Sequence, residues 1–169
     1  MYEVAYINQK WAKDSLGWYM ARIRAGEYKY RRVADKTGVP WQVVAVIHAL
    51  ECSGDFKKHL HNGDPLSKKT VRAPEGRPLA DTWDWESSAV DAIRYDRLDQ
   101  KNWKDMGTAL RNIEYYNGKG YEYRNMPSPY LWGGTQFHSK GKFVRDGKFD
   151  PEAHTRQIGA AILLKEAGF

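Results

Sequence analysis

Apolar residues recur at helical spacing in several stretches of this 169-residue chain. Residues 8–24 and 27–36 predict two helices, the second of which ends before Gly38. Pro40 suits the first turn of a third helix, because its missing N–H costs nothing there. That helix, 41–51, has the sequence WQVVAVIHALE and is the most apolar helix start in the chain, so we expect it to be central.

Between Ser53 and Thr82 the helical period disappears. Turn formers are dense there, including Asn-Gly-Asp-Pro at 62–65 and Pro-Glu-Gly at 74–76. The run Lys69–Arg72 is a candidate for one arm of a small hairpin. Long irregular segments in compact domains are usually functional or mobile, so this segment is a candidate border of a site.

Helical patterns return at 85–98 and 103–116. A tight turn is expected at Arg-Asp-Gly, 145–147, and a last helix is expected to open at 150–151, Asp-Pro. The residues available to cap the helix at 85 are Asp81, Thr82 and Asp84.

No internal repeat, low-complexity tract or linker divides the chain, which predicts a single domain, 1–169, of the mainly α (α+β) class. No apolar run approaches the length of a membrane span, and the first residues lack the pattern of a secretory signal. Cys52 is the only cysteine, so no intramolecular disulfide can form. We therefore expect no stable membrane insertion and synthesis in a reducing cytoplasm.

The charge balance favours a polyanionic partner. Lys and Arg total 27 against 21 Asp and Glu, a formal charge of +6, which suits nucleic acid, an anionic membrane or an acidic cell wall. Aromatic residues make up 14% of the chain, with 7 Trp and 11 Tyr, and flat rings stack on sugars as well as on bases. No helix-turn-helix, zinc-finger or ribonucleoprotein motif is present, so nucleic acid is not the expected partner.

Glu51 is the candidate for a general acid. It ends the most apolar helix, close to Ile47 and Leu50. A partly apolar setting and the negative end of a helix dipole both disfavour an ionised carboxylate. A carboxyl group that stays protonated near neutral pH is what cleavage of a glycosidic bond requires of its acid.

The segment VVAVIHALECSGDF resembles the catalytic helix of the lysozyme-like superfamily, which includes goose-type lysozymes, soluble lytic transglycosylases and many phage endolysins. In that superfamily an apolar helix delivers a Glu that is followed by Ser and an aromatic residue, here Glu51, Ser53 and Phe56. The later YYNGKGY, 115–121, resembles the Asn-Gly loop that lines the glycan cleft. The resemblance extends over roughly 40–130 and implies a helical fold with a small β-hairpin lobe beside the cleft.

The resemblance also implies the reaction: cleavage of the bond between N-acetylmuramic acid and N-acetylglucosamine in peptidoglycan, with Glu51 as acid and no cofactor. Phage-type lysozymes of this superfamily have an Asp with a Thr six residues later, a spacing that Asp64 and Thr70 share. The Asp would act as base or electrostatic stabiliser, and the Thr would position water. The rival carboxylates are Asp55, Glu75, Asp81 and Asp84.

The expected contacts to glycan are aromatic rings, amide groups and glycines that let backbone approach a ligand. Those residues are Ser53, Tyr116, Asn117, Gly118, Tyr121, Tyr130, Trp132 and Gln136. The resemblance further implies a monomeric phage endolysin, made in the cytoplasm without a signal and acting on the wall in the periplasm after release.

Three alternatives remain open at this point. A lytic transglycosylase would act on the same bond, although the Gly-Leu-Met-Gln stretch typical of that group is absent. His48, His59 and His61 could instead bind zinc in a cell-wall amidase or peptidase. A non-catalytic binder of glycan or nucleic acid would use only the charge and the aromatic rings.

Overall fold

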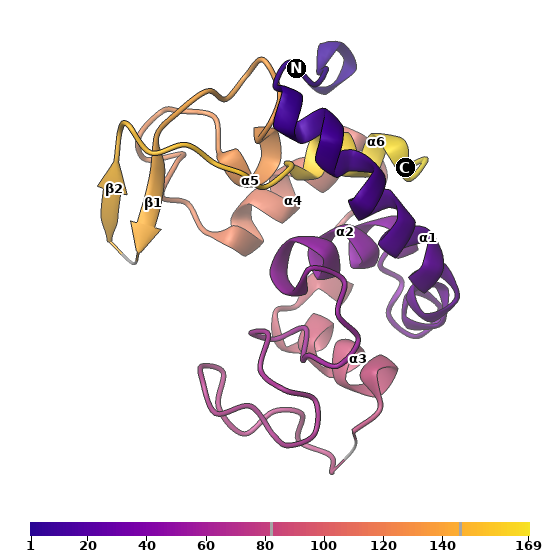
Figure 1. Cartoon of the computed structure of the whole chain (residues 1–169). Helices are drawn as coiled ribbons and strands as arrows, with labels where there is room; N and C mark the ends of the chain where they lie inside the picture. Colours follow the sequence, from indigo (N-terminus) through magenta and orange to yellow (C-terminus); the bar gives the residue numbers. More distant parts are fainter. Residues whose placement is uncertain (82, 146) are drawn as a thin grey trace. The chain divides into compact units, whose positions relative to one another are not determined.

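The computed structural model describes residues 1–81, 83–145 and 147–169. The protein is mainly α with a small two-stranded antiparallel sheet, and this fold class confirms the prediction (Figure 1). The elements in chain order are η1 (Tyr2–Val4), α1 (Lys10–Thr37), α2 (Trp41–Cys52), α3 (Trp85–Tyr95), η2 (Leu98–Gln100), α4 (Met106–Asn117), α5 (Pro129–Trp132), β1 (Lys142–Arg145), β2 (Lys148–Asp150) and α6 (Ala160–Glu166).

The chain divides into two compact units. Unit 1 comprises Met1–Met20 and Lys104–Phe169, and unit 2 comprises Ala21–Trp103. Each unit carries part of α1, because that helix runs from Lys10 to Thr37. We describe the two units separately.

Helix α1 is continuous, so the prediction of two helices with a break after Arg24 is wrong. Gly26 lies inside the helix and is buried. A Cβ atom at this position would approach Phe56 Cζ to 2.5 Å and the Tyr30 ring to 2.7 Å. The glycine therefore permits close packing and does not end the helix. The predicted stop at Gly38 is confirmed by its left-handed φ of 74°.

The core of unit 2 is built around α2. All residues from Val43 to Leu50 are buried, as the apolar pattern predicts. Four rings from three helices and the loop after α2 pack with centroids 4.6–5.7 Å apart: Tyr30, His48, Phe56 and Trp85. The Tyr30 hydroxyl lies 2.9 Å from His48 Nδ1, and His48 Nε2 donates to the Asp55 carbonyl. Burial lowers the pKa of His48 to about 4, so the ring is neutral at pH 7.

The described residues between α2 and α3 form no helix and no strand, which confirms the irregular segment. The prediction of a hairpin arm at Lys69–Arg72 is wrong, because these residues form no strand. The backbone N–H groups of Val71 and Arg72 donate to the Asp64 carboxylate, and a strand ladder would need those same groups. Asp84 caps α3 by accepting from Ser87 N. Of the other predicted caps, Thr82 lies outside the described residues.

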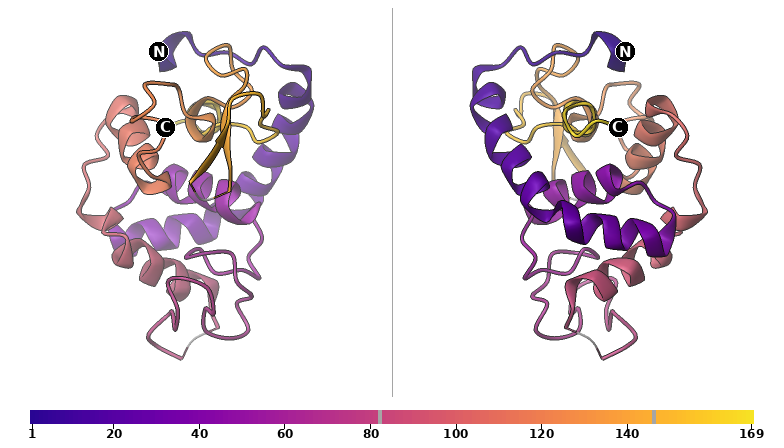
Figure 2. Two further views of the ribbon diagram at one scale, coloured as in Figure 1. Left: turned by 90° about the vertical axis from the view of Figure 1, so that its left-hand side faces the viewer. Right: turned by 90° about the vertical axis from the view of Figure 1, so that its right-hand side faces the viewer.

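Unit 1 contains α4, α5, α6 and the hairpin, together with the first part of α1. Helix α5 contacts both α4 and α6 (Figure 2). Gly159 N donates to Gly133 O at 2.9 Å, and a Cβ atom on Gly159 would overlap the Leu131 carbonyl. Gly133 and Gly159 therefore allow the backbones of α5 and α6 to meet directly. Strands β1 and β2 pair antiparallel with Phe143 opposite Phe149.

The hairpin and the last helix test two further predictions. The tight turn expected at 145–147 falls between β1 and β2, but its central residue, Asp146, lies outside the described residues. The helix expected to open at 150–151 begins only at Ala160. Residue 150 instead ends β2, and the Ala153 carbonyl accepts from Gly141 N, which holds the following segment against the hairpin.

Candidate functional site

Glu51 lies in the last turn of α2. Its chain neighbours Leu50 and Cys52 are buried, whereas Glu51 is exposed. The helix ends at Ser53 and Gly54, which both adopt left-handed φ angles, of 55° and 67°. Glu51 therefore occupies an exposed position after the buried run Val43–Leu50, which is more open to solvent than the partly apolar setting expected for it. Its position is fixed by the end of the helix.

Asp96 is a second carboxylate of this site that the sequence analysis missed. It is the C-cap residue of α3 and is partly buried. Burial raises the pKa of Asp96, and the negative charge of Glu51 raises it further. Asp96 therefore keeps its proton to a higher pH than an isolated carboxyl group does.

The turn at 62–64 borders the same helix end. A Cβ atom built on Gly63 would lie 3.8 Å from the Glu51 carbonyl oxygen and 3.9 Å from Arg72 Nη2. The Arg72 guanidinium donates to the Asp64 carboxylate at 2.6 Å while two thirds of its side chain, 65%, stays exposed. The turn backbone at Gly63 therefore lies near both Glu51 and the Arg72 side chain.

Asp64 organises this loop. Its buried carboxylate accepts from Val71 N at 2.9 Å, Arg72 N at 3.0 Å and Arg72 Nε at 2.6 Å, and from Asn62 Nδ2 at 3.2 Å. The backbone N–H of Arg72, above all, holds the pKa of Asp64 well below its usual range. Since its oxygens already accept four hydrogen bonds, Asp64 has little capacity left for a water molecule or a sugar.

Thr70 has a similar role. Its side chain is almost fully buried, its hydroxyl donates to the Pro74 carbonyl, and Arg77 N donates to it at 2.8 Å. Thr70 N also donates to the Arg77 carbonyl. These bonds close the turn at 74–76. The structure thus uses both Asp64 and Thr70 to shape the loop, and their catalytic roles stay predictions.

The three histidines of the zinc alternative bind different protein partners. His59 places its ring nitrogens 2.7 Å from Ser88 Oγ and 2.7 Å from the Lys68 carbonyl. His61 Nε2 lies 2.8 Å from an Asp91 carboxylate oxygen. The ring of His48 belongs to the aromatic cluster. Across the described ranges, no three His, Cys, Asp or Glu residues are grouped as a metal site.

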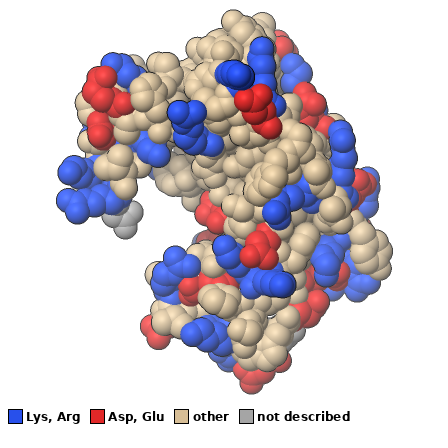
Figure 3. Space-filling model, viewed as in Figure 1, with Lys and Arg blue, Asp and Glu red and all other residues tan. Residues whose placement is uncertain are grey.

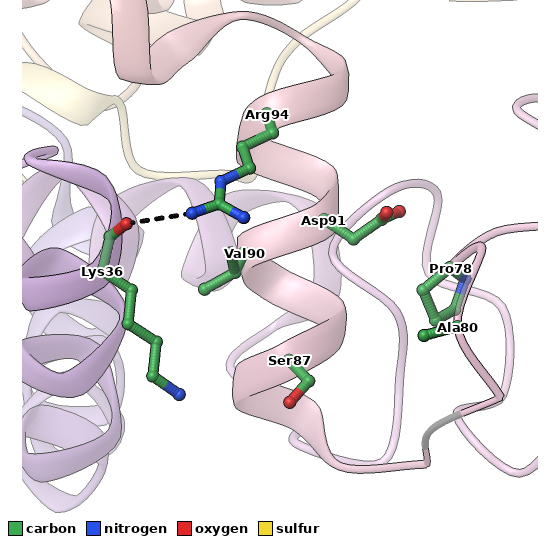
Figure 4. A pocket seen from close by; sticks show the side chains of 7 residues that line it. All are labelled: Lys36, Pro78, Ala80, Ser87, Val90, Asp91 and Arg94. Carbon is green, nitrogen blue, oxygen red and sulfur yellow. Dashed lines mark hydrogen bonds between the residues drawn. The ribbon is translucent and has the colours of Figure 1, made fainter.

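A hollow of about 280 Å³ beside α3 contains further charged side chains (Figure 4). Arg94 donates to the Lys36 carbonyl, and Asp91 accepts two hydrogen bonds from Arg77 in addition to its contact with His61. Asp91, on α3, therefore holds the loop that contains Arg77 against this helix. Its carboxylate has little capacity left for a ligand.

In unit 1, Asn117 and Gly118 lie at the rim of a hollow of about 430 Å³. Asn117 is exposed, and the Cβ direction of Gly118 opens into free space. Tyr121 is buried: its hydroxyl accepts from Phe143 N, and its ring packs edge to face on Phe143. Tyr116, just before the rim, is partly exposed. The Asn-Gly loop thus offers Asn117 and Gly118 to a ligand, while Tyr121 supports the hairpin.

The other expected sugar contacts pack within unit 1. Tyr130 and Trp132 are each only 7% exposed. Gln136 accepts from Tyr6 N and donates to the Val4 carbonyl, which fixes the N-terminal segment. The structure therefore gives Tyr130 and Gln136 structural contacts. Of the sugar contacts expected in unit 2, Ser53 is exposed, two residues after Glu51.

Comparisons with models of protein families, with curated proteins and with solved structures found no match to the chain. Within the part of the chain that the structure describes, no helix has both the length and the apolar character needed to cross a membrane.

Proposed function

We propose that the protein cleaves the glycosidic bond between N-acetylmuramic acid and N-acetylglucosamine in peptidoglycan. The observation that carries the proposal is the pair formed by Glu51 and Asp96. Glu51 is exposed at the end of a buried helix, and its charge raises the pKa of the partly buried Asp96. Glycosidases use two carboxyl groups, one of which must hold a proton near neutral pH.

In this proposal the pair shares one proton. Glu51, the exposed member, delivers it to the leaving glycosidic oxygen. Asp96 is then the carboxylate that stabilises positive charge on the sugar ring or orients water. Asp64 remains the alternative partner on the basis of its spacing to Thr70, although its oxygens already accept four hydrogen bonds.

Ser53 in unit 2 and, separately, Asn117 and Gly118 in unit 1 are accessible and remain candidates for glycan contacts. The formal charge of +6 suits an anionic wall. We propose further that the protein acts as a monomeric phage endolysin, made in the cytoplasm and acting on the wall in the periplasm after release, with no cofactor and no nucleic-acid partner.

The test is digestion of purified peptidoglycan, with the fragments identified by mass spectrometry. New reducing ends are expected from hydrolysis, whereas anhydro-muramic ends would indicate a transglycosylase. Glu51→Gln is expected to lose turnover by about 100-fold or more, because general acid catalysis contributes roughly that much, while still binding wall. The matched control is Glu166→Gln, an exposed carboxylate at the end of α6. Cleavage of peptide bonds, or full activity in Glu51→Gln, would contradict the proposal.

A further inference from the structure

Unit 1 contains a second pair of carboxylates, in a separate hollow of about 460 Å³. Glu114, on α4, is partly buried, and Glu122 follows in the loop after α4. Burial raises the pKa of Glu114, and the charge of Glu122 raises it further. In the described ranges neither carboxylate forms a salt bridge. Both carboxylates therefore keep acceptor oxygens for a ligand.

Arg111, Met1 and two aromatic residues also line the hollow. Arg111 precedes Glu114 by one helical turn on α4, so both side chains lie on the same side of that helix, and Arg111 is exposed. Trp132 is 7% exposed, and Tyr115 is 40% exposed. Lys119 Nζ already lies 4.6 Å from the centroid of the Tyr115 ring, which shows that this ring accepts an ammonium group.

These groups match a ligand that carries both an ammonium and a carboxylate. An ammonium group placed between Glu114 and Glu122 would relieve their mutual repulsion and form charge-assisted hydrogen bonds. The Arg111 guanidinium presents paired donors that fit a carboxylate. A lining that holds both carboxylates and a guanidinium matches a ligand with both charges better than a purely anionic ligand.

We propose that this hollow binds the amino-acid end of a diamino acid, with Glu114 and Glu122 on its ammonium group and Arg111 on its carboxylate. Such ends occur in the peptide side chains of cell walls as lysine or a related residue. Naming the wall peptide as the source rests on the proposed function, whereas the chemistry of recognition rests only on the hollow. The site would select or position wall segments by their peptides, a task separate from bond cleavage.

The test is calorimetric titration with two peptides: N-acetyl-L-alanyl-γ-D-glutamyl-L-lysine, and the same peptide ending in norleucine, which lacks only the ammonium group. The wild type is expected to bind the lysine peptide at least tenfold more tightly. Glu114→Gln and Glu122→Gln are each expected to lose that preference, and Arg111→Gln to weaken both peptides. Glu166→Gln, an exposed carboxylate on α6, is the matched control and should bind like the wild type.

Equal affinity for the two peptides would overturn the proposal, and so would an unchanged lysine preference in both glutamate variants. Glu122 is exposed, so its variant is expected to fold even if Glu114→Gln does not, and thermal melting checks each protein. Glu51→Gln is expected to bind the lysine peptide like the wild type. If Glu51→Gln instead retains full turnover, the glycosidase proposal fails while the binding result stands.

Discussion

The two units each hold a pair of carboxylates, and the pairs differ in what surrounds them. In unit 2, Glu51 and Asp96 lie at the ends of two helices, beside a loop that the buried Asp64 keeps in shape. In unit 1, Glu114 and Glu122 lie in a hollow with a guanidinium and aromatic rings. Each pair has one raised pKa. A raised pKa by itself therefore does not identify an acid catalyst, and the neighbouring groups decide between proton transfer and binding.

Cationic side chains show a further difference between regions. Lys and Arg gather at the end of the hairpin of unit 1 (Figure 3), where the exposed residues are Arg145 and Lys148. In unit 2, Arg72 is held in place, because its guanidinium binds Asp64. The hairpin can thus attract a polyanion by charge alone, whereas Arg72 acts at a fixed position.

The largest expected effect distinguishes the roles of the two carboxylate pairs, one in catalysis and one in binding. Asp96→Asn removes the partner charge of Glu51 and is expected to lower turnover on peptidoglycan by about 100-fold. Glu122→Gln should change turnover on peptide-free glycan by less than about twofold. Steady-state rates across pH 4–8 measure both, and equal losses in the two variants would remove the distinction.

The next effect concerns the stability of unit 2 and pH. The pKa of His48 is lowered from 6.5 to about 4 in the folded protein. The unfolded chain therefore binds more protons below pH 6.5, and stability is lost as pH falls from 6.5 toward 4. We expect a loss of about 2 kcal/mol in the free energy of unfolding between pH 7 and pH 4.5 from this residue. Urea unfolding at both values measures it, and His48→Gln should show a smaller loss than the wild type.

Asp64→Asn tests whether Asp64 shapes the loop or acts in catalysis. Its charge-assisted bonds to Val71 and Arg72 predict a destabilisation of about 2 kcal/mol. At a temperature well below the melting point, turnover should stay within tenfold of the wild type if the role is structural. A loss as large as that of Asp96→Asn, with the fold intact by circular dichroism, would assign the second catalytic role to Asp64 instead.

The smallest effects compare two glycines of α1, one in each unit. Gly26→Ala is expected to destabilise by about 1–3 kcal/mol, because its Cβ would overlap Phe56 and Tyr30. Gly17→Ala meets no atom within 4 Å and should stabilise by about 0.5–1 kcal/mol through higher helix propensity. Thermal melts of both variants provide the comparison. Changes of the same sign would show that Gly26 is not needed for packing.

The spacing of apolar residues and the positions of turn formers predicted the elements that depend on neighbouring residues in the sequence. Helix α2, its start after Pro40 and the irregular segment that follows agree with the apolar spacing and the turn formers. The continuity of α1 could not be predicted, because Gly26 weakens a helix in isolation and is retained for contacts with Phe56, which lies 30 residues away in sequence (56 − 26). Tertiary packing outweighed local propensity there.

The site was predictable only in part, for a similar reason. Glu51 is identified by its position at the end of an apolar helix, whereas Asp96 has no pattern of its own and meets Glu51 only through folding. Composition predicts that aromatic rings are numerous but not which are exposed, and Tyr121 and Tyr130 proved to be buried. Buried rings and ring-lined ligand sites have the same sequence signal.

The way Asp64 holds its loop has a consequence for how the sequence can vary. Val71 contributes only its backbone N–H to the Asp64 carboxylate, and its own side chain is 62% exposed. Any residue except proline supplies the same N–H. The side chain at position 71 can therefore change while the loop keeps its shape, which gives evolution or a designer an adjustable contact on the loop that adjoins the end of α2.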